Sequence, residues 1–262
     1  MYFSETSDRK QFVVNIFELF RKRLQDARRV FVKPNIVSYE PYPTTTHPDV
    51  LEGVLRGLSW CDVVVGDAPA IDAGRSNRIL QKSPLWKVCD DFGVKLVNLY
   101  SEKMKVFEGP RGYKVRASTL PLDFDLVISL PVLKIHGMVG LSGALKNQFG
   151  YLSRRDRYLM HCKIKNIYKG IAEVNAAVHT DLFIVDAVET MIKAQECRHG
   201  GCPARLNVMM SGTDPVSLDR FGLRLLEKLE PEFERKNRQA LSYVGYASKY
   251  GLGSESFEAK KI

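Results

Sequence analysis

Short runs of branched apolar residues alternate along the chain with longer segments in which apolar residues recur every three or four positions. The first pattern predicts buried strands, and the second predicts amphipathic helices. The predicted strands cover residues 29–37, 61–67, 94–99, 123–130, 181–186 and 206–210. The predicted helices cover residues 7–24, 48–58, 84–93, 164–178 and 215–229, and a further helix begins at residue 231.

The strands are rich in Val, Ile and Leu and show no regular alternation of apolar and polar residues. That composition favours an α/β fold with a mainly parallel sheet covered by helices on both faces. A tight turn at residues 109–112 predicts a small hairpin beside the sheet. Residues 151–165 and 189–205 have little regular period, and the first segment suits either a lid or a solvated connection. We expect a single domain over residues 1–262, while an arrangement in two lobes, 1–110 and 111–262, stays open.

The overall composition is that of a soluble globular protein. Hydrophobic residues make up 45% of the sequence and charged residues 26%. No apolar run approaches the roughly 20 residues that span a bilayer, and the first residues lack the pattern of a signal peptide. The five cysteines are scattered, which does not indicate a disulfide framework. We therefore expect a cytoplasmic protein without a membrane partner.

The net charge of +9 and the isoelectric point near 9.3 favour anionic partners. These values suit a small anionic ligand and also permit nucleic-acid binding. No zinc-finger spacing or aromatic ribonucleoprotein motif is present, so nucleic acid is the less favoured partner. RNA binding through the basic segment from Arg154 to Lys169 stays an alternative. The sequence does not indicate an oligomeric state.

Residues 123–150 hold the largest concentration of candidate chemistry. A predicted strand ends at Pro131, and a glycine-rich turn that opens at Gly140 leads into a short predicted helix. A helix N-terminus favours anions, and an imidazole can transfer a proton near neutral pH. The candidate residues of this stretch are Lys134, His136, Ser142, Gly143, Lys146 and Asn147.

Polar residues also follow other predicted strands or precede a helix in the same half of the fold. They are Lys33, Asn35, His47, Asp67 and Asp186. Because the carboxyl ends of parallel strands meet at one edge of a sheet, we expect them to join the same site. His136 or His47 would transfer a proton, with Asp67 as the orienting or second acid–base group, and Lys33, Asn35 and Asp186 would contact the ligand.

This constellation predicts an enzyme that acts on a small anionic ligand, of which phosphorylated and nucleotide-like compounds are candidates. The reaction class stays open. No G-x-G-x-x-G fingerprint, Walker A sequence or G-x-S-x-G elbow is present, so the usual dinucleotide, P-loop and hydrolase signatures do not narrow it. Asp214 and Asp219 are assigned to helix capping and core support.

Cys197, His199 and Cys202 place three metal-binding side chains within six residues. This spacing predicts a partial zinc or iron site, whose fourth ligand would come from elsewhere, such as His161 or Cys162. The alternative function is therefore a non-catalytic protein that binds a metal or metallocofactor or serves as a redox partner. The other interpretation of this segment is an irregular loop with reduced cysteines.

Several short motifs occur together in one order along the chain. They are Lys33-Pro34-Asn35, Thr45-Thr46-His47-Pro48, Gly66-Asp67-Ala68-Pro69, Leu130 to Gly137, Gly143 to Gly150, Val185-Asp186 and Asp214 to Asp219. In this order they resemble the domain of unknown function family numbered 362, from about Val30 to Leu226. Many members of that family carry an appended ferredoxin-like segment with four cysteines. This chain has no such motif, so the resemblance implies no intrinsic cluster here.

The central stretch is more distantly similar to the nickel-dependent lactate racemase family. In that family a strand, a histidine and a glycine-rich turn with a lysine serve a nucleotide-derived nickel cofactor. The similarity would carry over only His136 and Lys146. It implies a metal ion or a nickel-type nucleotide cofactor as a candidate, and the cofactor is otherwise unknown.

Overall fold

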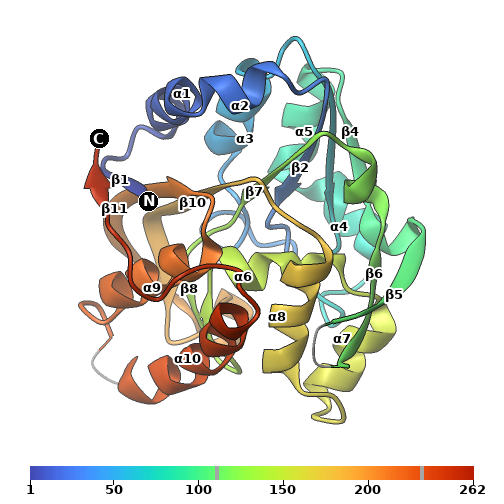
Figure 1. Ribbon diagram of the computed structural model, residues 1–262, viewed down its shortest axis with the longest axis vertical. Helices are drawn as coiled ribbons and strands as arrows, with labels where there is room; N and C mark the ends of the chain where they lie inside the picture. The colour runs from blue at the N-terminus through green and yellow to red at the C-terminus, as the bar shows by residue number, and fades with distance from the viewer. Residues whose placement is uncertain (110–111, 231–232) are drawn as a thin grey trace.

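One eight-stranded sheet organises the computed structural model, which describes residues 1–109, 112–230 and 233–262 (Figure 1). From edge to edge the strands are β12 (Lys260–Lys261), β1 (Tyr2–Glu5), β11 (Cys202–Gly212), β10 (Leu182–Ile192), β7 (Leu126–Leu130), β2 (Arg29–Pro34), β3 (Asp62–Asp67) and β4 (Lys95–Asn98). Neighbouring strands from β10 to β4 pair in parallel, whereas β11 pairs antiparallel with β10 and β1. The predicted mainly parallel sheet is confirmed.

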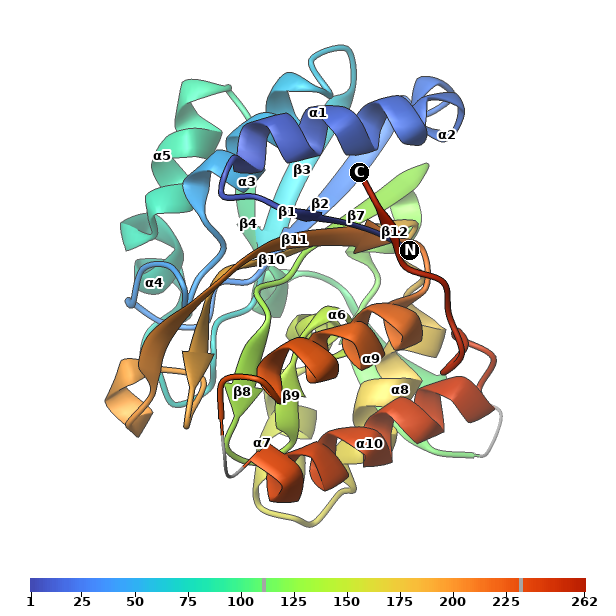
Figure 2. The same ribbon diagram turned by 90° about the vertical axis from the view of Figure 1, so that its left-hand side faces the viewer.

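Helices cover both faces of this sheet (Figure 2). One face carries α1 (Arg9–Leu19), α2 (Arg21–Gln25), α3 (Pro48–Arg56), α4 (Ser76–Lys82) and α5 (Pro84–Asp91). The other carries α6 (Ala144–Asn147), α7 (Arg154–His161), α8 (Ile167–Ala177), α9 (Pro215–Leu226) and α10 (Phe233–Lys249). Successive residues of a strand point to opposite faces. Val30 and Val32 therefore pack in the core beneath α1 to α5, and Phe31 packs in the core beneath α6 to α10. Both faces of β2 are therefore apolar, as its sequence predicts.

Two small antiparallel sheets accompany the main one. β5 (Met104–Glu108) pairs with β6 (Lys114–Ser118), which confirms the predicted hairpin, although Pro110 and Arg111 of its turn lie outside the described residues. β8 (Lys134–His136) pairs with β9 (Gly140–Ser142) and was not predicted. Short 3-10 turns occupy η1 (Leu99–Ser101), η2 (Leu120–Asp123), η3 (Gln148–Tyr151) and η4 (Cys197–His199).

Two segments that the sequence presented as irregular are regular in the structure. β10 and β11 extend as a paired hairpin as far as Ile192 and Cys202. The outer half of β11 is partly exposed, so its residues are not uniformly apolar and show no buried-strand pattern. The segment after residue 151 contains α7, which Ser153 caps by accepting a hydrogen bond from the Asp156 amide. Few of its residues are buried, and the helical period is correspondingly faint.

The N-terminal helix also differs from its prediction. Asp8 caps α1, which therefore begins at Arg9 rather than at residue 7, and Phe20 separates α1 from α2. β1 precedes that helix and pairs with β11, far along the chain, which is a long-range contact that local pattern does not reveal. The main sheet contains strands from both of the expected lobes. Within the described ranges, no helix is long and apolar enough to cross a membrane.

Candidate functional site

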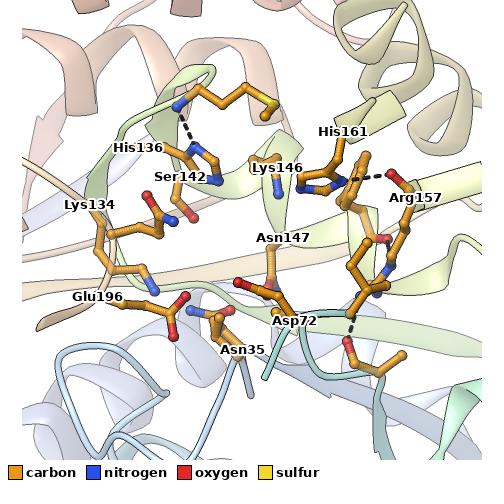
Figure 3. Close-up of a pocket in the computed structure, with 18 of the residues that line it drawn as sticks. Asn35, Asp72, Lys134, His136, Ser142, Lys146, Asn147, Arg157, His161 and Glu196 are labelled. Carbon is orange, nitrogen blue, oxygen red and sulfur yellow. Dashed lines mark hydrogen bonds between the residues drawn. The ribbon is translucent and has the colours of Figure 1, made fainter. Parts of the chain in front are cut away.

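The carboxyl ends of β2, β3 and β7 border one cavity of about 540 Å³ (Figure 3). β2 lies between β3 and β7 in the sheet. After β2 the chain adds β3 and β4 on one side, and it later adds β7 on the other side. Such switch points are where open parallel sheets commonly bind ligands. The cavity lining includes the predicted residues Lys33, Asn35, Asp67, Lys134, His136, Ser142, Lys146 and Asn147.

Lys33 and Asp67 form a buried ion pair in the cavity wall. Lys33 Nζ lies 2.7 Å from Asp67 Oδ1, and the Asp67 carboxylate also accepts from the amides of Ile36 and Ala68 at 2.6 and 2.8 Å. Burial lowers the pKa of Lys33, and the neighbouring carboxylate opposes that shift. A Cβ at Gly150 would come within 2.4 Å of Asp67 Oδ1, so the pair requires glycine there. Both charges are thus satisfied within the protein.

Lys134 is fully buried and forms no such ion pair with any residue that the structure describes. Its Nζ donates a hydrogen bond to the Thr44 carbonyl oxygen at 2.6 Å. Burial lowers the pKa of Lys134 to about 8, although the more distant Glu196, Glu40 and Asp67 act against the shift. The amine therefore retains donor capacity toward the cavity that it lines.

Lys146 projects from α6 into the cavity between His136 and His161 (Figure 3). Within the described ranges it has no hydrogen-bond or ion-pair partner, and its Nζ lies over the Phe149 ring, 4.1 Å from the centroid. Burial lowers the pKa of Lys146 to about 7, and the positive charges of Arg157, Lys134 and Lys33 lower it further. Near neutral pH, this amine exists in both protonation states.

Raising the pH from 7 to 9 should stabilise the protein through Lys146. Its folded pKa of about 7 lies below the ordinary lysine value of about 10.4, so in that range the unfolded chain binds more protons and the free energy of unfolding rises with pH. Lys146→Met should reduce this rise by about 1–2 kcal/mol, while Lys134 contributes with the same sign in both proteins. Urea unfolding at matched ionic strength measures the effect, and an unchanged slope in the variant would contradict it.

His136 faces the cavity as a hydrogen-bond donor. Its Nδ1 accepts from the backbone amides of Met138 and Val139 at 3.2 and 3.4 Å. An accepting Nδ1 places the proton of the neutral ring on Nε2. Burial lowers the pKa of His136 well below its ordinary value, and the charges of Lys146 and Lys134 add to that shift. The ring is therefore neutral, with Nε2–H available to a ligand.

His161 has the opposite tautomer. Its Nδ1 lies 2.6 Å from the Arg157 carbonyl oxygen, which can only accept, so Nδ1 carries the proton and Nε2 keeps its lone pair. Burial lowers the pKa of His161, the hydrogen bond to the Arg157 carbonyl opposes that shift, and the charges of Lys146 and Arg157 add to it. A neutral imidazole with a free Nε2 is a suitable proton acceptor. The sequence suggested His161 only as a further metal ligand and did not place it in this site.

Arg157 is a further cavity residue that the sequence analysis did not place in this site. Its Nε donates to the Phe149 carbonyl, and Nη1 donates to the carbonyls of Ala68 and Pro69 and to the Tyr100 hydroxyl. Nη2 is buried and has no hydrogen-bond partner among the described residues. The sequence signal that could have located Arg157 is Ser153, a helix-capping residue. It begins α7 and so places Arg157 one turn into that helix.

His47 and Asp186 lie outside the cavity lining, as far as the structure describes the chain. Asp186 accepts from Arg9 Nε at 2.6 Å and from the Tyr42 hydroxyl at 2.9 Å, which anchors α1 to the middle of β10. His47 caps α3 through Nδ1, which accepts from the Asp49 amide, and its ring packs edge-on against Tyr42. The expectation that they join the other residues is therefore corrected, because both are held in this separate cluster.

The predicted anion site at the N-terminus of α6 is filled by a carboxylate of the protein itself. Asp219 of α9 accepts from the amides of Ala144 and Leu145, the first residues of α6, at 2.6 and 3.2 Å. A Cβ at Gly143 would lie 2.3 Å from Asp219 Oδ1, so glycine permits this approach. Asp219 thus caps a helix, as expected, but the helix is α6 rather than its own. Asp214 caps α9 by accepting from the Ser217 amide.

The polar neighbours Asn35 and Asn147 line the cavity with their amides engaged. Asn35 Nδ2 donates to the Thr44 carbonyl, and Asn147 Nδ2 donates to Ser129 Oγ at 2.9 Å. The first bond closes the loop that follows β2, and the second ties α6 to β7. Each amide oxygen can still accept from a bound group.

Cys197, His199 and Cys202 do not assemble a metal centre. Both cysteines are exposed, and His199 Nε2 lies 3.4 Å from Asp72 Oδ2 and 3.5 Å from Glu196 Oε1. Throughout the part of the chain that the structure describes, no group of three or more His, Cys, Asp or Glu side chains is placed to hold a metal ion. We therefore assign no chemical step to a metal ion held by this loop.

Comparison with known proteins supports the resemblance noted from the sequence. A family model described as a domain of unknown function, DUF362, matches residues 30–224. No curated protein matches the sequence. The lactate racemase apoprotein from Thermoanaerobacterium thermosaccharolyticum superimposes with a TM-score of 0.55 at 15% identity, over 81% of this chain and 53% of that chain.

A Thermotoga maritima protein of known crystal structure gives a TM-score of 0.51 at 14% identity, over 89% of this chain and 60% of that chain. This chain thus spans between one half and two thirds of the length of these two neighbours. At such identities the likeness shows a shared fold alone. Because the family model matches well over half of the sequence, the chain belongs to the DUF362 family.

Proposed function

We propose that this protein is an enzyme whose cavity binds a small anionic ligand. The supporting observation is the excess of cations over available carboxylates. Lys134, Lys146 and Arg157 Nη2 have no carboxylate partner within the described ranges. Burying positive charge without a partner is costly, and an anionic ligand would offset that cost.

The carboxylates that line the cavity are already engaged. Asp67 pairs with Lys33, while Asp72 and Glu196 both contact Arg198 and His199. None of these three acids contacts Lys134 or Lys146 directly. The unpaired Arg157 donor and the Lys134 amine suit a carboxylate or a phosphate, since both groups accept several charge-assisted hydrogen bonds.

Acid–base chemistry in the cavity would come from the two histidines. His161 Nε2 can accept a proton, and His136 Nε2–H can donate a hydrogen bond to a developing negative charge. Asp67, predicted as an orienting group for a histidine, instead positions Lys33. The basic segment that suggested RNA binding has Arg157 buried and Lys165 paired with Asp156 at 2.8 Å, which favours the small-ligand function.

Small anions should raise the melting temperature of the full chain at constant ionic strength. Suitable probes are phosphate, pyrophosphate, AMP, pyruvate and succinate, with affinities then measured by calorimetry. We expect at least one probe to bind, and Lys146→Met or Lys134→Met to weaken it about tenfold or more. Lys22→Met, which changes an exposed lysine on α2, is the matched control. Absence of binding by all probes, or equal affinity in the cavity variants, would refute the proposal.

A further inference from the structure

We propose that Lys146 is a nucleophile that forms an imine with its ligand, and that the ligand class is therefore small anionic carbonyl compounds such as oxo acids. This inference rests on the proposed function, which supplies the anion-binding cavity. It goes further by naming the reacting atom, the functional group of the ligand and a covalent intermediate.

The three lysines in the cavity lining differ in what holds them. Lys33 Nζ is committed to Asp67 at 2.7 Å, and Lys134 Nζ donates to Thr44 at 2.6 Å. Lys146 has neither kind of contact within the described ranges, and only the face of Phe149 lies beneath its amine. A nucleophile needs a free lone pair and room for the reacting carbon. Lys146 alone among these three meets both requirements.

The electrostatic surroundings favour the neutral amine. With a pKa of about 7, about half of the Lys146 side chains are neutral at pH 7, against about one in 2000 for a lysine of ordinary pKa. Desolvation and neighbouring cations are recognised means of activating a lysine for imine formation. The same cations would attract the carboxylate of an oxo acid and hold it beside the amine.

The two imidazoles supply complementary groups on either side of Lys146 (Figure 3). The amine lone pair attacks the carbonyl carbon, and the C=O π electrons move to oxygen, which His136 Nε2–H stabilises by a hydrogen bond. His161 Nε2 takes one proton from nitrogen and returns it to that oxygen, giving a carbinolamine. The C–O bond then breaks as nitrogen forms the C=N bond, and His161 carries the second nitrogen proton to the departing hydroxide. Amine and carbonyl thus yield imine and one water, without an oxidant or reductant.

Reductive trapping tests this step directly. The full chain is incubated with pyruvate or glyoxylate and sodium cyanoborohydride, and the labelled lysines are located by peptide mass spectrometry. We expect labelling of Lys146 to exceed that of any other lysine by about tenfold or more. Lys146→Met and Lys146→Arg should abolish this adduct, the second while retaining a positive charge, and Lys22→Met should preserve it. Succinate should protect Lys146, and the neutral carbonyl compound acetaldehyde should label it about tenfold less.

The outcomes separate the two proposals. If anions bind in the calorimetric experiment but Lys146 is not preferentially labelled, the imine is refuted and the anion-binding function stands. If no anion binds, the proposed function itself fails. Equal labelling by acetaldehyde and pyruvate would show a reactive lysine without anion selectivity, which would overturn the assigned ligand class.

Discussion

Replacing Asp67 by Ala is expected to lower the free energy of unfolding by about 3–5 kcal/mol. The substitution leaves the Lys33 ammonium buried without its carboxylate at 2.7 Å, and it removes the acceptor of the Ile36 and Ala68 amides. Both Lys33 and Asp67 are almost fully buried, so water cannot readily replace the lost contacts. Urea unfolding monitored by circular dichroism measures the change.

Two controls distinguish a buried charge from a general loss of a carboxylate. Asp91→Ala breaks the exposed ion pair with Lys87 and should cost about 0.5 kcal/mol or less. Adding Lys33→Met to Asp67→Ala should recover part of the loss, because the unpaired charge is then removed. If Asp67→Ala costs no more than Asp91→Ala, the buried pair does not have the assigned role.

Asp219→Ala is expected to destabilise the protein by about 2–4 kcal/mol. The carboxylate lies 2.6 Å from the Ala144 amide and 3.2 Å from the Leu145 amide, and all three residues are buried. Without it, the first amides of α6 lose their acceptor, and Lys146 on the same helix loses a fixed position. Unfolding of the variant by urea, together with anion binding, would show both effects.

The cost of Asp219→Ala should also depend on pH. Burial raises the pKa of Asp219 to about 7, above the ordinary aspartate value of about 3.9. The folded state therefore binds more protons between these values, so the stability that this group contributes is full at low pH and is lost as the pH rises through about 7. The penalty should be larger at pH 5 than at pH 8. Asp219→Asn keeps one acceptor and should cost less. Because neither Asn nor Ala titrates, both penalties should fall by a similar amount as the pH rises, and a penalty independent of pH in the Ala variant would contradict the assignment.

The sequence located the three lysines, Asp67 and His136 of the cavity lining but missed the contribution of α7. Lys33, Asp67, Lys134 and His136 follow apolar strands, and parallel strands bring such positions to one edge. The cavity lining contains these residues together with Lys146. His161 and Arg157 were not placed there because their helix buries the polar residues Asp156 and Arg157 and so shows little apolar period. The role of each lining residue in binding or catalysis remains a prediction for the experiments above.

The alternation of apolar strands and amphipathic helices determined the α/β class, the largely parallel sheet and the edge on which the cavity lies. Burial of one helix face gives apolar residues a helical period, and burial of both strand faces gives a short continuous apolar run, so both signals are local in the sequence. Only the tertiary structure decided which charges pair. Asp219 caps a helix 75 residues away, and Arg9 meets Asp186 across 177 residues, so no local pattern could show that these acids are engaged. Electrostatic pairing acts through space between atoms that the fold brings together. The fold consequently leaves Lys146 without an acidic partner among the described residues, and that property defines the candidate site.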